Sequence, residues 1–225
     1  MPARTRDAAE RVATPLGEVV IAQLAASELD AAIAALGADE QAHARMLAGP
    51  RRVAFVAGRT ALHAAAPQLA TVAVLAGERG APAMPTGWTG SIAHKLDRAG
   101  GGAVAAAIAA HGGDASLGVD LEHAVAPRQP IERRILTARE LPFTDRRLVS
   151  RAFAIKEAIY KAVDPFVRRY VAFTEVAVRA LDDGTCEVDI VDATRLPVAI
   201  EAWWGERDGM WLAVARARRA ATMAP

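Results

Sequence analysis

The sequence has little cysteine and almost no net charge, and each scarcity excludes a class of protein. Its 225 residues contain one cysteine, Cys186, which excludes an internal disulfide framework and a zinc site built from several cysteines. Lys plus Arg (27) and Asp plus Glu (26) nearly cancel, to a net charge of +1. Bulk attraction to nucleic acid or to an anionic membrane is therefore not indicated, and we expect neither as a partner.

Long hydrophobic runs are also lacking. The longest, from Ala103 to Ala110, is much shorter than the roughly 20 residues that span a bilayer. The N-terminal MPARTRDAAERVATP contains no apolar stretch of the kind found in secretory signals. Together with the single cysteine, this indicates a reducing compartment, and we expect a cytoplasmic protein.

Several common catalytic motifs are missing as well. The sequence contains no GxxxxGK[ST] phosphate loop and no GxGxxG after a predicted strand. Ser91 and Ser116 lie in no GxSxG turn, and no HExxH pattern is present. P-loop nucleotidases, Rossmann dehydrogenases, serine hydrolases and zincin proteases are therefore disfavoured.

The elements that are present follow a similar plan in each half. The first half predicts a loose arm over 1–15 and a strand over 17–25. Two short helices follow, over 28–36 with Ser27 as cap and over 40–47 with Asp39 as cap, and then a long helix over 51–66. A Gly/Pro-rich loop over 77–90 leads to strands over 90–95 and 103–110. The second half predicts a strand over 116–122 and a basic connector over 127–140. A long helix follows over 146–163, with Asp145 as its cap and Asp164-Pro165 as its stop. Four strands complete this half, over 174–181, 185–191, 198–204 and 210–216, with turns at 182–184 and 205–209.

This arrangement predicts an α+β fold. We expect two lobes related by a pseudo-twofold axis, each a long helix packed on a small antiparallel sheet, spanning 1–115 and 116–225. A two-lobed single chain also favours a monomer.

Two acidic stretches are candidates for chemistry. In Gly118-Val119-Asp120-Leu121-Glu122, Asp120 and Glu122 project from the same face of a strand, and a pair of carboxylates there favours Mg²⁺ or Mn²⁺ over zinc. On the second long helix, Glu157 and Lys161 are four residues apart and share a face. A third carboxylate from that helix would complete a site for a hard cation. Taken alone, the strand could be an ordinary polar face and the helix pair a solvated ion pair.

Basic residues form two further candidates. His94 follows the Gly/Pro-rich loop, where it could bind a phosphate or serve only as a structural strand-end residue. Arg52 and Arg59 lie two turns apart on one predicted helix, and Arg79 lies in the loop that follows. Guanidinium groups suit a terminal phosphate, although surface arginines usually serve solubility alone.

In their order along the chain, these segments resemble the 4′-phosphopantetheinyl transferases of the Sfp/EntD type. The resemblance extends over residues 45–180 and is carried by RRVAFVAGRTALHAAA, GERGAPAMPTGWTGSIAHK, GVDLE and FAIKEAIYKA. Four positions depart from the family pattern, namely Met84, Ala93, Lys95 and Ala154. None of them removes an expected metal ligand, although Ala93 replaces a hydroxyl residue at the phosphate site.

The resemblance implies an enzyme of the holo-[acyl-carrier-protein] synthase type, with coenzyme A as donor and an apo acyl or peptidyl carrier protein as acceptor. It implies that a carrier serine receives the 4′-phosphopantetheine arm and that adenosine 3′,5′-bisphosphate leaves. Fatty-acid, polyketide and peptide synthetase carriers, including those of siderophore and other secondary metabolite pathways, remain open. The alternatives are a non-catalytic coenzyme A or carrier-binding module and a divalent-metal phosphohydrolase.

The same resemblance implies a role for each candidate residue. Asp120, Glu122 and Glu157 would coordinate Mg²⁺, and the catalytic residues would be Glu157 as general base, Lys161 and His94. Contacts to coenzyme A would come from six basic residues: Arg52, Arg59, Arg79, His94, Lys156 and Lys161. Because carriers are typically acidic, the seven arginines between Arg128 and Arg151 are a candidate docking surface.

Overall fold

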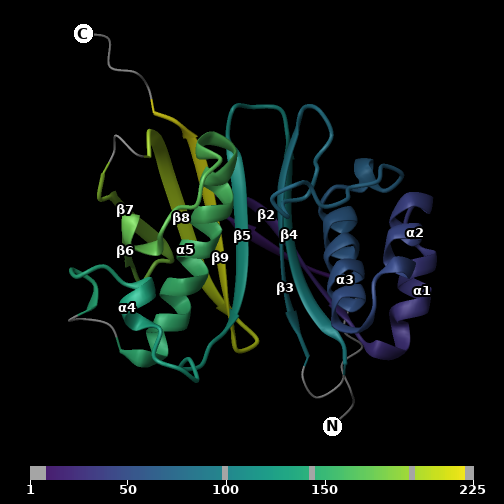
Figure 1. The fold of residues 1–225 in the computed structure, drawn as a ribbon, viewed down its shortest axis with the longest axis horizontal. Coiled ribbons are helices and arrows are strands. Elements are labelled where there is room, and N and C mark those ends of the chain that lie inside the picture. The colour runs from purple at the N-terminus through teal and green to yellow at the C-terminus, as the bar shows by residue number, and fades with distance from the viewer. Residues whose placement is uncertain (1–8, 98–100, 142–144, 193–195, 221–225) are drawn as a thin grey trace. The chain divides into compact units, whose positions relative to one another are not determined.

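The computed structural model describes residues 9–97, 101–141, 145–192 and 196–220. The chain divides into two compact units, Met1–His111 and Gly112–Pro225. Each unit contains a long helix that covers one face of an antiparallel sheet (Figure 1). The expected α+β class, with a long helix on a small antiparallel sheet in each half, is therefore confirmed.

The first unit is built around a sheet of strand order β1-β2-β4-β3. Its elements are β1 (Ala9–Thr14), β2 (Gly17–Leu24), α1 (Leu29–Ala34), α2 (Ala38–Met46), α3 (Gly49–Ala65), β3 (Trp88–Leu96) and β4 (Ala103–His111). Pro50 lies in the first turn of α3, where a missing backbone N–H costs nothing. Helix α3 buries Val56, Ala57 and Leu62 against β2 and β4, which forms the core of this unit.

Three local expectations for the first unit are wrong. Residues 9–14 were expected in a loose arm but form β1, which pairs with β2 from Ala9↔Ala22 to Thr14↔Gly17. Ser27 does not cap α1, because a 3₁₀ turn (Ala26–Glu28) precedes that helix. Asp39 does not cap α2 either, since the helix already begins at Ala38 after Gly37.

The second unit has a sheet of strand order β5-β9-β8-β7-β6. Its elements are β5 (Ser116–His123), α4 (Glu132–Ile135), α5 (Arg146–Val167), β6 (Val176–Ala180), β7 (Thr185–Ile190), β8 (Val198–Arg207) and β9 (Met210–Arg219). Helix α5 packs on β5, β9 and β8, and its residues Ala158, Ile159 and Ala162 lie in the core.

Helix α5 begins where the sequence predicts but ends later than expected. Asp145 caps the helix as predicted, because its Oδ1 accepts a hydrogen bond of 3.0 Å from the Arg147 amide. The expected stop at Asp164-Pro165 is wrong, since the helix continues to Val167 and ends at Arg168, which adopts a left-handed φ of 48°. Pro165 removes one backbone bond in the last turn only, so packing of Phe166 and Val167 outweighs that loss.

Strand pairing shapes the rest of this unit. Strands β8 and β9 extend further than expected and join through Asp208-Gly209, whose φ values of 46° and 72° suit a two-residue hairpin turn. The predicted turn at 182–184 connects β6 to β7. Strand β7 pairs with β8 only at Thr185↔Trp203 and Cys186↔Ala202. The β6–β7 hairpin therefore diverges from the sheet beyond Cys186.

None of the helices in the described ranges is both long enough and apolar enough to cross a membrane.

Candidate active site

A glycine brings the two acidic stretches together. A Cβ atom on Gly118 would lie 1.9 Å from the carbonyl oxygen of Ala158 and 2.8 Å from the amide nitrogen of Ala162. The backbone of α5 therefore touches β5 at this point, and only glycine allows the contact. Because alternate strand residues share a face, Asp120 and Glu122 project from β5 on the same side as Gly118, toward α5.

An ion pair joins strand and helix beside this contact. The Nζ of Lys161 donates to Asp120 Oδ1 at 2.7 Å and to the Val119 carbonyl at 2.9 Å. An ammonium has three donors, so one remains for a further acceptor. Asp120 is 7% exposed, and its Oδ2 is buried without any hydrogen-bond partner. An unsatisfied buried carboxylate oxygen suits a hard cation, so Asp120 fits the implied Mg²⁺.

Glu122 and Glu157 are half-buried on β5 and α5. Glu157 lies one helical turn before Lys161 and next to Ala158, the residue that touches Gly118. Within the described ranges, no three His, Cys, Asp or Glu side chains are already arranged to hold a metal ion. The coordination of one ion by Asp120, Glu122 and Glu157 together stays a prediction.

Lys156 is placed differently from the other candidate cations. Its side chain is 2% exposed, and its Nζ donates to the Ile135 carbonyl at 2.8 Å, to Glu140 Oε2 at 2.7 Å and to the Phe173 carbonyl at 3.1 Å. All three donors are thus used within the protein. This geometry indicates a structural role, in which Lys156 fixes α5 to the segments on either side of it.

The arginines of α3 also have internal partners. Arg52 donates to the carbonyls of Leu47 (2.7 Å) and Arg45 (3.2 Å) at the end of α2. Arg59 is 6% exposed, donates to the Val74 carbonyl and lies 3.8 Å from Glu40 Oε1. Burial lowers the pKa of Arg59 to about 10, while Glu40 opposes that change. Both arginines therefore stabilise the first unit, whatever they also contact.

The two remaining basic candidates of the first unit are more accessible. Arg79 is exposed in the loop between α3 and β3, and His94 is exposed on β3 opposite Ala105 of β4. The predicted phosphate contact of each stays a prediction.

Glu140 is a connecting residue that sequence reasoning missed. It accepts hydrogen bonds from the Thr137 amide (2.6 Å), the Val178 amide (2.9 Å) and Lys156 (2.7 Å). Glu140 thereby ties the segment after α4 to both α5 and β6. The Thr-x-x-Glu spacing of Thr137 and Glu140 is typical of a capping box and could have indicated the first of these bonds.

Two sequence models of known families match the chain. The model of the "4'-phosphopantetheinyl transferase N-terminal domain" matches residues 38–109, and that of the "4'-phosphopantetheinyl transferase superfamily" matches residues 116–215. A curated relative, 4'-phosphopantetheinyl transferase Npt of Nocardia iowensis, is 34% identical over 148 residues. That alignment covers 61% of this chain and spans 63% of the length of the relative.

Solved structures that match part of the chain include two synthases. Holo-ACP-synthase from Plasmodium yoelii is 17% identical, with a TM-score of 0.37 and coverage of 45% of this chain and 91% of that one. The ACPS-CoA complex from Chronobacterium ammoniagenes is 19% identical, with a TM-score of 0.38 and coverage of 48% and 98%.

Proposed function

Because the chain belongs to the 4′-phosphopantetheinyl transferase superfamily, we propose that it transfers the 4′-phosphopantetheine arm of coenzyme A to a serine of an apo carrier protein. The observation that supports this most is the pairing of Lys161 with Asp120, at 2.7 Å. It joins the GVDLE strand to the KEAIYK helix, the two segments that most closely resemble the family. We place the enzyme in the holo-[acyl-carrier-protein] synthase type, with an acyl or peptidyl carrier as partner.

The proposed reaction is a displacement at the β-phosphate of coenzyme A. The serine hydroxyl of the carrier attacks the phosphorus, the bond to the leaving adenosine 3′,5′-bisphosphate breaks, and Glu157 takes the hydroxyl proton. Lys161 holds a phosphate oxygen with its remaining N–H donor, where it also offsets the negative charge that develops during transfer.

Asp120, Glu122 and Glu157 would hold Mg²⁺, with Mn²⁺ as a substitute. A bound divalent ion would supply positive charge to the diphosphate oxygens. Lys161 orients Asp120 by bonding its Oδ1, which leaves Oδ2 for the ion. Coenzyme A contacts in the first unit are assigned to Arg79 and His94, which are exposed, ahead of Arg52 and Arg59.

The test is a transfer assay on a panel of apo acyl and peptidyl carriers, read by intact mass. We expect the wild-type protein to add the phosphopantetheine mass to at least one carrier, and EDTA to abolish the addition until Mg²⁺ is restored. Glu157→Gln should lower kcat by roughly 10²-fold or more, because a general base contributes about that much. The matched control is Glu206→Gln, an exposed carboxylate of β8, which should leave kcat unchanged.

Other results would support the competing functions. Coenzyme A binding without transfer to any carrier would indicate a non-catalytic binding module. Metal-dependent hydrolysis of coenzyme A in the absence of a carrier would indicate a phosphohydrolase. Transfer by Glu157→Gln at the wild-type rate with saturating Mg²⁺ would exclude Glu157 as the base.

A further inference from the structure

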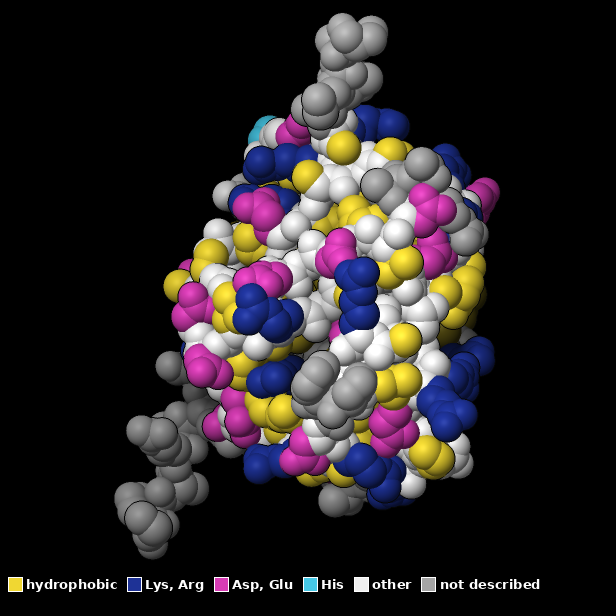
Figure 2. Space-filling model, turned by 90° about the vertical axis from the view of Figure 1, so that its left-hand side faces the viewer, with side chains coloured by type: hydrophobic (Ala, Val, Ile, Leu, Met, Phe, Trp, Pro, Cys, Tyr) yellow, Lys and Arg dark blue, Asp and Glu magenta, His cyan; other side chains and the backbone are white. Residues whose placement is uncertain are grey.

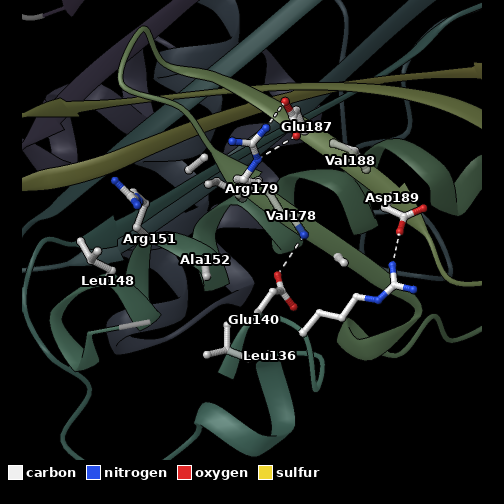
Figure 3. Close-up of a pocket in the computed structure, with 14 residues that line it drawn as sticks. Leu136, Glu140, Leu148, Arg151, Ala152, Val178, Arg179, Glu187, Val188 and Asp189 are labelled. Atoms are coloured by element: carbon white, nitrogen blue, oxygen red, sulfur yellow. Dashed lines mark hydrogen bonds and ion pairs between the residues drawn. The ribbon is translucent and has the colours of Figure 1, made fainter. Parts of the chain in front are cut away.

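The second unit contains a pocket that no proposed transfer residue lines. It has a volume of about 690 Å³ and lies between the first half of α5, the segment after α4, and the β6–β7 hairpin (Figure 3). The pocket exists because this hairpin pairs with β8 over two residues only. Small-molecule sites are typically about 300–1,000 Å³, so the volume suits a ligand.

The walls of the pocket are largely apolar. Helix α5 contributes Leu148, Ala152 and Ile155, and the hairpin contributes Val178 and Val188. Figure 2 views the side of the molecule that carries β6 and β7, where charged side chains of both signs border hydrophobic surface. An aliphatic group entering this pocket would be removed from water on several sides, which is favourable.

Each acidic side chain on the pocket wall has a cationic partner. Arg179 Nε donates to Glu187 at 2.8 Å, and Arg139 donates to Asp189 at 3.0 Å, both drawn in Figure 3. Glu140 is paired with Lys156 at 2.7 Å. The three carboxylates are thus already neutralised by these cations. They therefore cannot also balance an additional cation on the pocket wall.

Arg151 supplies that further charge. Its guanidinium carbon lies 4.2 Å from the ring centroid of Trp204. Among the residues that the structure describes, Arg151 has no hydrogen-bond acceptor and no carboxylate in an ion pair. Stacking occupies the face of a guanidinium, whereas its N–H donors point outward in the plane and stay available. Burial lowers the pKa of Arg151 from its usual value, while the charges of Cys186 and Asp182 oppose that change. Asp182 forms no ion pair with the guanidinium, so an anion that bonds it directly would compensate for lost hydration.

We propose that this pocket binds a small aliphatic carboxylate. The carboxylate accepts hydrogen bonds from the Arg151 guanidinium, and the hydrocarbon chain lies along Leu148, Ala152 and Ile155. A monocarboxylate matches the site because one guanidinium fork pairs with one carboxylate, and because the other wall charges are already balanced. The assignment concerns a second site on this protein and does not depend on the transfer reaction.

Octanoate is the probe for this site, and titration calorimetry of the full chain measures its binding. Tryptophan fluorescence gives a second signal, since the Arg151 guanidinium that the carboxylate engages lies over the rings of Trp204 and Trp211. We expect saturable binding of one octanoate per chain, and binding of the neutral analogue 1-octanol at least tenfold weaker.

Three variants separate the contributions. Arg151→Met removes the charge and should weaken octanoate binding at least tenfold. Ala152→Phe fills the pocket while keeping Arg151, and should prevent binding even if Arg151→Met proves unstable. The matched control is Arg147→Met, an exposed arginine of the same helix outside the pocket, which should bind octanoate like the wild type.

Several outcomes would overturn the proposal. They are no saturable octanoate binding by the wild type, equal affinity for octanoate and 1-octanol, or unchanged affinity in Ala152→Phe. A further one is that Arg151→Met weakens binding of an acidic carrier protein while leaving octanoate affinity intact. In that case the pocket would be part of a protein-docking surface.

Discussion

Glu40 of α2 is fully buried in the first unit and has partners from two other segments. Its Oε2 lies 2.7 Å from His63 Nε2, and its Oε1 accepts from the Val74 amide at 2.9 Å and lies 3.8 Å from Arg59. One carboxylate therefore holds α2, α3 and the loop after α3 together. Its burial is complete, with 0% exposure, so no water can replace a lost partner.

Removing this carboxylate should destabilise the protein strongly. We expect Glu40→Ala to lower the free energy of unfolding by about 3–5 kcal/mol, because Arg59 would be left buried without a counter-charge. Urea denaturation measures the change. As a control, Glu78→Ala, in an exposed loop, should change stability by no more than about 0.5 kcal/mol. A loss below about 1 kcal/mol in Glu40→Ala would contradict this account of Glu40.

Single residues also show the limits of sequence interpretation. The motif around Lys156 indicated a cation near phosphates, but its three internal bonds could not be foreseen, because acceptors at Ile135, Glu140 and Phe173 come from separate segments. The same holds for Arg59, whose type suggests an anion ligand and whose burial depends on tertiary packing. Lys161 and Asp120 differ from these two residues, because they are paired with each other at the candidate site. Periodicity had predicted that Asp120 shares a strand face with Glu122 and that Lys161 shares a helix face with Glu157.

At the scale of elements, the contact between α5 and β5 positions the candidate active site. Periodicity predicted both elements, since their apolar positions repeat with the spacing of a helix and a strand. It could not predict β1, whose short polar sequence shows little alternation, nor the continuation of α5 through Pro165. Local patterns do not include the packing energy that decides such cases.

Gly118 gives a direct test of that contact. Gly118→Ala should push α5 away from β5, because the new Cβ would overlap the Ala158 carbonyl and backbone atoms cannot rotate aside. We expect a stability loss of about 1–3 kcal/mol, as for other overpacked sites, together with a fall in transfer activity. Thermal unfolding and the transfer assay measure the two effects.

A control for this variant is Gly37→Ala, where a Cβ would meet no atom within 4 Å. It should cost no more than about 1 kcal/mol, since Gly37 only precedes α2. If Gly118→Ala kept the stability and transfer activity of the wild type, the close contact between α5 and β5 would not be required, which would contradict this prediction.

For the whole molecule, the net charge of +1 conceals an uneven distribution. The segment from Arg128 to Arg151 contains seven arginines and only three acidic residues. Two of these arginines, Arg139 and Arg146, are paired with Asp189 and Glu132. Arg133 and Arg134 are exposed on α4, where they could attract an acidic partner.

Reversing those two charges should weaken docking of a carrier. We expect the double variant Arg133→Glu, Arg134→Glu to raise the KM for the carrier, with little change in kcat. The KM of this variant should also depend less on salt concentration than the KM of the wild type. Steady-state kinetics at several ionic strengths measure this. The variant Arg45→Glu, Arg51→Glu changes the net charge equally in the first unit and should leave that KM unchanged. An unaltered KM in the α4 variant would place docking elsewhere.

The bond from Glu140 to β6 has a consequence for solubility. Strand β6 lies at the edge of its sheet, and the Val178 amide points outward, where it meets Glu140 at 2.9 Å. Unpaired edge amides are templates on which other chains add strands and aggregate. By occupying this donor with a carboxylate of its own, the protein keeps the outer edge of the second sheet from recruiting a neighbour.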